Sequence, residues 1–111
     1  RGSFNITEPV DYTSHVLRAV IEEQPNLDLA EIEDVIIGCG HPEGCMGMNM
    51  ARIASMDAGI PQTAAATTVN RFCSSGSTSF DHNAFGTTPN MLPPSKAKRP
   101  ASNSVQFHVM L

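Results

Sequence analysis

The chain has 111 residues, a formal net charge of −4 and three cysteines. This length allows one small domain with a modest core, and the acidic balance argues against a nucleic-acid partner. No stretch approaches the roughly 18 consecutive apolar residues of a membrane span, and no basic-then-apolar signal peptide opens the sequence. An odd number of cysteines cannot all pair, which favours a reducing, soluble compartment.

The charge is unevenly distributed along the chain. Residues 1–76 contain ten acidic and four basic residues (net −6), whereas residues 77–111 contain one acidic and three basic residues (net +2). The basic cluster Lys96, Lys98 and Arg99 is too short to indicate an anionic partner, so we interpret it as part of a solvated tail.

The first elements along the chain are predicted to be helical. Thr7 precedes Glu8 and Pro9, which is typical of a helix start with a hydroxyl cap and proline in the first turn. Apolar residues then recur at nearly helical spacing as far as Ile21, and the helix should end near residues 24–25. Asp28 is then expected to cap a short helical turn over residues 29–32.

The middle of the chain alternates strand, helix and strand. The β-branched run 35–37 predicts a buried parallel strand closed by Gly38, and a glycine-rich loop follows over residues 40–47. Residues 48–58 predict a helix capped by Gly59, and residues 64–69 predict the next strand. This alternation favours a parallel α/β layer.

Some side chains of the second predicted helix are expected to face the core. The apolar residues Met48, Ile53 and Met56, with alanines between them, would form its buried face. Together with Met46 and Met50, these methionines are interpreted as filling the core or an interface. The glycines of the preceding loop lack the spacing of a dinucleotide-binding or phosphate loop, so we interpret Gly38-x-Gly40 as a sharp turn.

Cys73 is the main candidate for chemistry. It follows the second predicted strand and precedes Ser74, Ser75 and Gly76, so it should lie on a tight turn with a helix opening behind it. Ligands of parallel α/β sheets bind beyond the carboxyl ends of the strands, and peptide N–H groups at a helix N-terminus favour the thiolate. Cys73 would then carry an acyl group during turnover. The alternative is that it packs as a small buried hydrophobe.

Several pieces of the sequence point to one family. Residues 34–40 (D-V-I-I-G-C-G), 42–44 (P-E-G), 47–52 (G-M-N-M-A-R), 58–61 (A-G-I-P) and 67–76 (T-T-V-N-R-F-C-S-S-G) occur in a fixed order and spacing. They closely resemble the N-terminal half of thiolases, and the N-R-x-C-x-S-G element is specific. The opening residues 1–4 resemble the segment just after the first strand of that family. The resemblance implies a partial, incomplete thiolase-like layered α/β sandwich over residues 1–76.

The same resemblance implies an activity and its parts. Thiolases are transferases that act on 3-ketoacyl-CoA and acetyl-CoA through an acyl-cysteine, which would be Cys73 here. Coenzyme A would be a substrate, no cofactor would be bound permanently, and the intact enzyme would be a homodimer or homotetramer. The first strand would lie ahead of Arg1. The family's C-terminal histidine (G-H-P), second cysteine (C-x-G) and asparagine (N-E-A-F) have no counterpart here, so the isolated fragment is expected to be inactive. His41-Pro42 lies in a different context and receives no catalytic role.

The character of the sequence changes after Gly76. Residues 77–86 are rich in Ser, Thr, Asp and Asn, which prefer caps and turns to helix interiors. Four prolines follow between residues 89 and 100, so residues 77–111 are predicted to form an irregular tail that matches no family. We hypothesise that this segment reflects a frame shift, a splicing artefact or an assembly error.

Two other functions compete with the acyltransferase. The chain could be a non-catalytic thiolase-like protein that binds a partner subunit or a lipid, with a genuine tail. Alternatively, Cys39, His41 and Cys45 could form a small metal or redox module, although their spacing is not that of a zinc finger and a fourth ligand is not obvious. For a thiolase, the compartment would be the cytoplasm in a bacterium and the mitochondrion or peroxisome otherwise.

Overall fold

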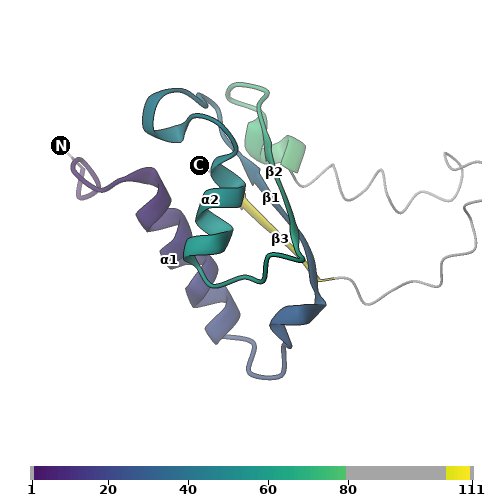
Figure 1. Ribbon diagram of the computed structural model, residues 1–111. Helices are drawn as coiled ribbons and strands as arrows, with labels where there is room; N and C mark the ends of the chain where they lie inside the picture. The colour runs from purple at the N-terminus through teal and green to yellow at the C-terminus, as the bar shows by residue number, and fades with distance from the viewer. Residues whose placement is uncertain (1, 80–104, 111) are drawn as a thin grey trace, which may run out of the picture.

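The structure, a computed structural model, describes residues 2–79 and 105–110, the last six as backbone only. The elements in chain order are α1 (Pro9–Glu22), the 3-10 turn η1 (Leu29–Glu31), β1 (Ile32–Gly38), the 3-10 turn η2 (Gly44–Met46), α2 (Met50–Asp57), β2 (Ala65–Val69) and β3 (Val105–Met110). Figure 1 shows their arrangement. The predicted order of helix, strand, helix and strand is therefore confirmed. None of the helices in the described ranges is long and apolar enough to cross a membrane.

The three strands form a parallel sheet in the order β2-β1-β3. β1 is the central strand, and its Asp34 to Gly38 lie opposite Ala65 to Val69 of β2. Because both pairings are parallel, the carboxyl ends of β1 and β2 meet at one edge of the sheet. The predicted parallel α/β layer is confirmed, and its carboxyl edge carries the loops that contain the cysteines.

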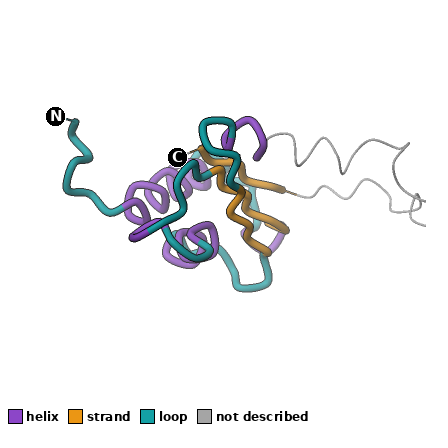
Figure 2. The backbone as a smooth tube through the Cα atoms, turned by 90° about the horizontal axis from the view of Figure 1, so that it is seen from above, coloured by secondary structure: helices purple, strands orange, loops and turns teal. Residues whose placement is uncertain are grey.

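Both faces of β1 are covered, which explains its continuous apolar sequence. Val35 and Ile37 point to one face, where they belong to the core cluster with Leu17 of α1 and Met50 of α2. Ile36 points to the opposite face and is also buried. Figure 2 shows α1 and α2 lying side by side against one face of the strands. The core therefore lies between the helix pair and the sheet.

The start of α1 differs in detail from the prediction. Pro9 is the first helical residue, as expected, but Glu8 occupies the cap position and its side chain makes no capping hydrogen bond. The predicted hydroxyl cap at Thr7 is therefore wrong. Asp28, in contrast, accepts a hydrogen bond from the Ala30 N–H at 2.9 Å at the start of η1, which confirms the predicted cap there.

The buried face of α2 is the clearest error of the sequence-based prediction. Met48 lies ahead of the helix and is 92 % exposed, and Ile53 and Met56 are 47 % and 50 % exposed. The buried residues are instead Met50, Ala51, Ala54 and Ser55. Small side chains face inward because α2 packs closely against both α1 and the sheet, and larger ones would not fit between these layers.

Parts of the predicted irregular tail are regular. Residues 75–79 are helical, and Val105–Met110 form β3 beside β1. The segment between them, residues 80–104, lies outside the described residues, and so does the basic cluster at 96–99.

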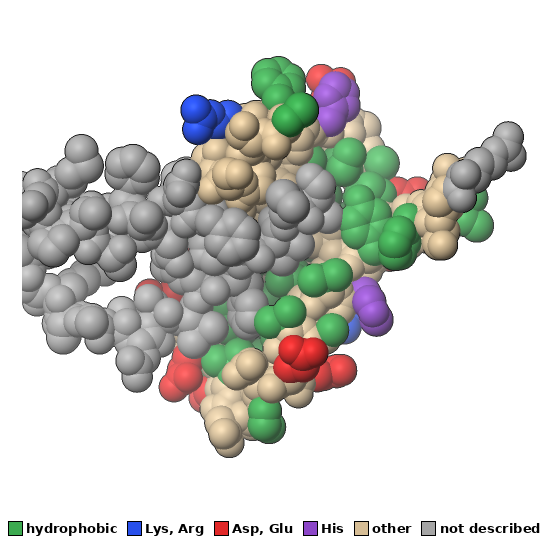
Figure 3. Space-filling model, turned by 180° about the vertical axis from the view of Figure 1, so that it is seen from behind, with side chains coloured by type: hydrophobic (Ala, Val, Ile, Leu, Met, Phe, Trp, Pro, Cys, Tyr) green, Lys and Arg blue, Asp and Glu red, His purple; other side chains and the backbone are tan. Residues whose placement is uncertain are grey.

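Charge is unevenly spread over the fold. Six carboxylates lie at the end of α1, in η1 and its flanking loop, and at the start of β1: Glu22, Glu23, Asp28, Glu31, Glu33 and Asp34. Figure 3 shows acidic side chains gathered over the lower part of the described surface. The carboxyl ends of β1 and β2 lie at the opposite end of the molecule.

Candidate active site

Cys73 lies where the sequence places it, on the turn between β2 and the helical residues 75–79. Its side chain is exposed, so the alternative of a buried packing residue is wrong. Figure 1 shows this turn at the carboxyl end of β2, beside the carboxyl end of β1. The sulfur of Cys73 is thus accessible at the edge where parallel α/β sheets bind their ligands.

The turn has an unusual backbone that local hydrogen bonds hold in place. Phe72 has a φ of +47°, in the left-handed region that side chains other than glycine and asparagine rarely adopt. The side chain of Asn70 accepts a hydrogen bond from the Phe72 N–H at 2.8 Å. The Phe72 carbonyl accepts from the Ser75 N–H at 3.0 Å. These bonds offset the strain and present Cys73 at the outer side of the turn.

Ser75 contributes more to this turn than the sequence suggests. Its hydroxyl accepts a hydrogen bond from the Arg71 N–H at 2.8 Å. It shares its own proton between the carbonyls of Phe72 at 2.7 Å and Cys39 at 3.2 Å. Sequence reasoning treated Ser75 only as a small residue that lets a substrate approach, because its type and spacing do not reveal a contact made 36 residues away.

Glycines bring the loop after β1 against the Cys73 turn. A Cβ atom on Gly38 would lie 2.5 Å from the carbonyl oxygen of Ser75, and one on Gly40 would lie 3.1 Å from that of Phe72. Neither Gly38 nor Gly40 has a positive φ. The interpretation of Gly38-x-Gly40 as a sharp turn is therefore wrong for Gly38, which lies within β1 and permits close backbone contact.

A second hydrogen-bond network joins α2 to β2 beneath the turn. The Asn49 side chain donates to the Ala66 carbonyl at 2.9 Å and accepts from the Thr68 hydroxyl at 2.9 Å and from the Arg52 N–H at 3.3 Å. The Thr68 hydroxyl in turn accepts from the Ala51 N–H at 3.0 Å. Asn49 therefore caps α2 and fixes it to the strand that leads to Cys73. This role was not predicted from the sequence.

The remaining cysteines do not form a second site. Cys39 is buried and Cys45 is exposed, and the Cys39 sulfur lies 3.9 Å from that of Met46. The exposed His41 pairs with Glu43, its Nε2 lying 3.4 Å from Oε2. Within residues 2–79 and 105–110, no group of three or more His, Cys, Asp or Glu side chains is placed to hold a metal ion. The structure therefore gives the metal-module alternative no support.

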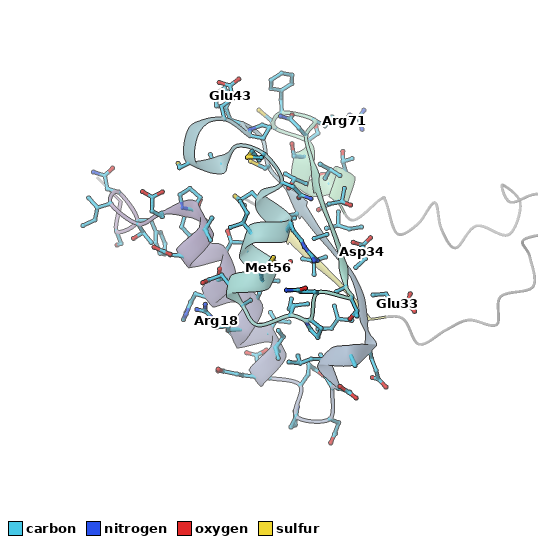
Figure 4. All side chains as sticks on the ribbon, in the orientation of Figure 1. Arg18, Glu33, Asp34, Glu43, Met56 and Arg71 are labelled. Atoms are coloured by element: carbon cyan, nitrogen blue, oxygen red, sulfur yellow. The ribbon has the colours of Figure 1, made fainter. Side chains whose placement is uncertain are left out.

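The loop of Cys39 and Cys45 also contacts Tyr12 of α1. Burial raises the pKa of the Tyr12 phenol, and the nearby thiols of Cys39 and Cys45 raise it further because their negative charge opposes a second one. This sulfur-rich loop thus packs onto α1, while Cys73 remains in solvent. Figure 4 shows Glu43 in this loop and Arg71 of the Cys73 turn at the same end of the molecule.

Comparison with known proteins identifies the family. Residues 1–84 match the model of the thiolase N-terminal domain, which is about three quarters of the chain. The chain belongs to the thiolase family. The match extends past Gly76, where the resemblance in sequence pattern ends, although residues 80–84 lie outside the described part of the structure.

Curated relatives agree with this assignment to the thiolase family. The chain is 43 % identical over 74 residues to a 3-ketoacyl-CoA thiolase of Aliivibrio salmonicida and 45 % identical to one of Photobacterium profundum. A 3-ketoacyl-CoA thiolase of Yersinia pestis is 43 % identical over the same length. Each alignment covers 67 % of this chain and 19 % of the relative. The chain thus spans about a fifth of the length of the thiolases that it matches.

Proposed function

We propose that this chain is the nucleophile-bearing part of a thiolase-type acyltransferase that acts on 3-ketoacyl-CoA and acetyl-CoA, with Cys73 as the acyl carrier. The observation that carries the proposal is the exposed sulfur of Cys73 on a strained, hydrogen-bonded turn at the carboxyl end of β2. Membership of the thiolase family and the names of the relatives support the substrate class.

The proposed reaction uses the sulfur of Cys73 twice. In the degradative direction, the thiolate attacks the keto carbonyl of a 3-ketoacyl-CoA and forms a carbon–sulfur bond. The bond between the keto carbon and its α-carbon then breaks, and the carbanion takes up a proton to leave as acetyl-CoA. The thiol of a second coenzyme A takes the acyl group and regenerates Cys73. In the biosynthetic direction, an acetyl-Cys73 receives the carbanion of acetyl-CoA.

The isolated chain should catalyse this cycle poorly at best. Complete turnover needs a general base and an oxyanion site for each carbonyl, and the motifs that supply them in thiolases have no counterpart in the sequence. Loss of one oxyanion donor alone costs about 3–4 kcal/mol of transition-state stabilisation. We therefore expect acyl transfer to Cys73 to be slow in this chain and complete turnover to be lost.

The distribution of charge is compatible with a coenzyme A thioester at this end of the sheet. Coenzyme A carries anionic phosphates, and the six-carboxylate cluster lies at the opposite end of the described fold. Repulsion between exposed charges is largely screened beyond a Debye length of about 8–10 Å. Coenzyme A is thus proposed as a substrate, with no permanently bound cofactor.

Assembly with further protein is the second part of the proposal. Ile53 and Met56 on the outer side of α2, together with Val16 and Val20 on α1, are exposed apolar side chains on neighbouring helices. Such residues lower the free energy when another surface covers them. We propose that the intact enzyme is a homodimer or homotetramer, which sedimentation equilibrium of the full-length protein tests directly.

Selective modification tests the role of Cys73. The chain is incubated separately with iodoacetamide and with acetyl-CoA, and each cysteine peptide is quantified by mass spectrometry. We expect acetylation of Cys73 at least about tenfold above that of Cys45, since thioester transfer needs more than an exposed thiol. Cys45 is a matched control because its side chain is also exposed. Equal acetylation of the two cysteines, or none on Cys73, would contradict the proposal.

A further inference from the structure

The hydroxyl of Ser75 is the best-connected side-chain group of the turn. Ser75 is 2 % exposed, and its hydroxyl makes hydrogen bonds to Arg71, Phe72 and Cys39. Two of these partners are the residues just before Cys73, and the third belongs to the loop after β1. One small hydroxyl therefore closes the Cys73 turn on itself and ties it to the neighbouring strand end.

The geometry of this contact leaves the turn little freedom. The Cys39 N–H also donates to the Val69 carbonyl at 2.9 Å, so the end of β1 is bonded to the end of β2 as well as to Ser75. The backbone of Ser75 lies against Gly38 with no room for a Cβ atom between them. Because packed backbone segments of this kind cannot slide continuously, the height of the turn above the sheet is fixed.

The neighbouring Ser74 provides a direct contrast. It is exposed, and its hydroxyl makes no hydrogen bond in the described part of the structure, although its backbone N–H donates to the Arg71 carbonyl at 3.0 Å. The two adjacent serines thus differ in whether the side chain holds the turn. Removal of the Ser75 hydroxyl would leave the Arg71 N–H without its partner, whereas removal of the Ser74 hydroxyl would break no bond.

From these contacts we propose that Ser75 is a positioning residue, whose buried hydroxyl holds the turn in the one arrangement that aims Cys73 at a thioester bound above the carboxyl ends of β1 and β2. The inference rests on the proposed acyl-transfer role of Cys73. It adds that exposure of the sulfur is not sufficient and that the direction in which the sulfur points depends on Ser75. Ser75 acts through the backbone of residues 71–73 and does not itself contact the substrate.

Two reactions of Cys73 separate positioning from exposure. Alkylation by iodoacetamide requires only an accessible sulfur, whereas acetylation by acetyl-CoA requires a directed one. For Ser75→Ala we expect acetylation of Cys73 to fall about tenfold, as for loss of a well-formed hydrogen bond, with alkylation changed less than about twofold. Ser74→Ala should leave both rates at the parent value, and Ser75→Thr, which keeps the hydroxyl, should recover most of the acetylation.

Each outcome of this experiment is decisive. Equal acetylation in Ser75→Ala and Ser74→Ala overturns the positioning role, and so does an equal fall of acetylation and alkylation in Ser75→Ala. If the parent chain is not acetylated at Cys73, the proposed function fails, and amide hydrogen exchange then decides the inference. Slow exchange of the Arg71 N–H in the parent chain supports it, whereas exchange at the rate of an unprotected amide overturns it. The exchange measurement also serves if Ser75→Ala does not fold.

Discussion

The loops after β1 and β2 present their cysteines in opposite ways. Cys39 directly follows β1 and is buried, with its sulfur 3.9 Å from that of Met46. Cys73 follows β2 by four residues and is exposed on a strained turn. Both lie at the carboxyl edge of the same parallel sheet. Position at a strand end therefore does not make a cysteine available for chemistry, and the hydrogen bonds of the following turn decide whether the sulfur faces solvent.

The contact between the two loops at Gly38 is where the comparison can be broken most severely. Gly38→Ala would place a Cβ atom 2.5 Å from the Ser75 carbonyl oxygen, so backbone must move. We expect the free energy of unfolding to fall by about 3 kcal/mol, at the upper end for overpacking. Urea unfolding followed by circular dichroism measures the change. The control is Gly2→Ala, where a Cβ atom meets nothing within 4 Å, and equal stability of the two variants would refute the assigned role of Gly38.

The same substitution at the two cysteines tests the comparison directly. Cys39→Ser buries a hydroxyl beside a thioether, a weak acceptor, and should cost about 2 kcal/mol of stability. Cys73→Ser changes an exposed side chain and should stay within about 0.5 kcal/mol of the parent. Both values come from chemical unfolding, and similar costs at the two positions would mean that their surroundings do not differ as described.

Asn49→Ala is expected to have a smaller effect that sharpens the comparison. Loss of the side chain removes the cap of α2 and its bonds to Ala66 and Thr68 of β2, which should cost about 1–2 kcal/mol. Asn5→Ala, in the exposed segment ahead of α1, is the matched control and should be nearly neutral. Because Asn49 supports β2, its loss should also raise amide exchange in residues 65–69, and unchanged exchange there would argue against this link.

The ion pair between Arg18 and Asp57 should have the smallest effect. The Arg18 guanidinium lies 2.6 Å from the Asp57 carboxylate, and both side chains are nearly half exposed. A double-mutant cycle with Arg18→Met and Asp57→Asn should give a coupling of less than about 1 kcal/mol. Arg18 lies far from Arg71 and the strand ends (Figure 4), so neither variant should alter alkylation of Cys73. A change in that rate would reveal coupling between the helix pair and the turn.

The sequence by itself determined the order of elements, the parallel layer and the position of the candidate nucleophile. These features follow from local signals: the β-branched run that became β1, proline at the start of α1, glycine after α2, and a cysteine followed by small residues after β2. The thiolase pattern added the family. Each signal is contained within a few consecutive residues, so it can be interpreted without knowledge of neighbours in space.

Only the tertiary structure decided which side chains are buried and what holds the Cys73 turn. Ile53 and Met56 were expected in the core and lie outside it, because close packing of α2 against α1 and the sheet selects small residues such as Ala51 and Ala54. Likewise, the bond from Ser75 to Cys39 joins residues 36 positions apart. Such contacts depend on how strands and helices are brought together, and no periodicity within one segment contains that information.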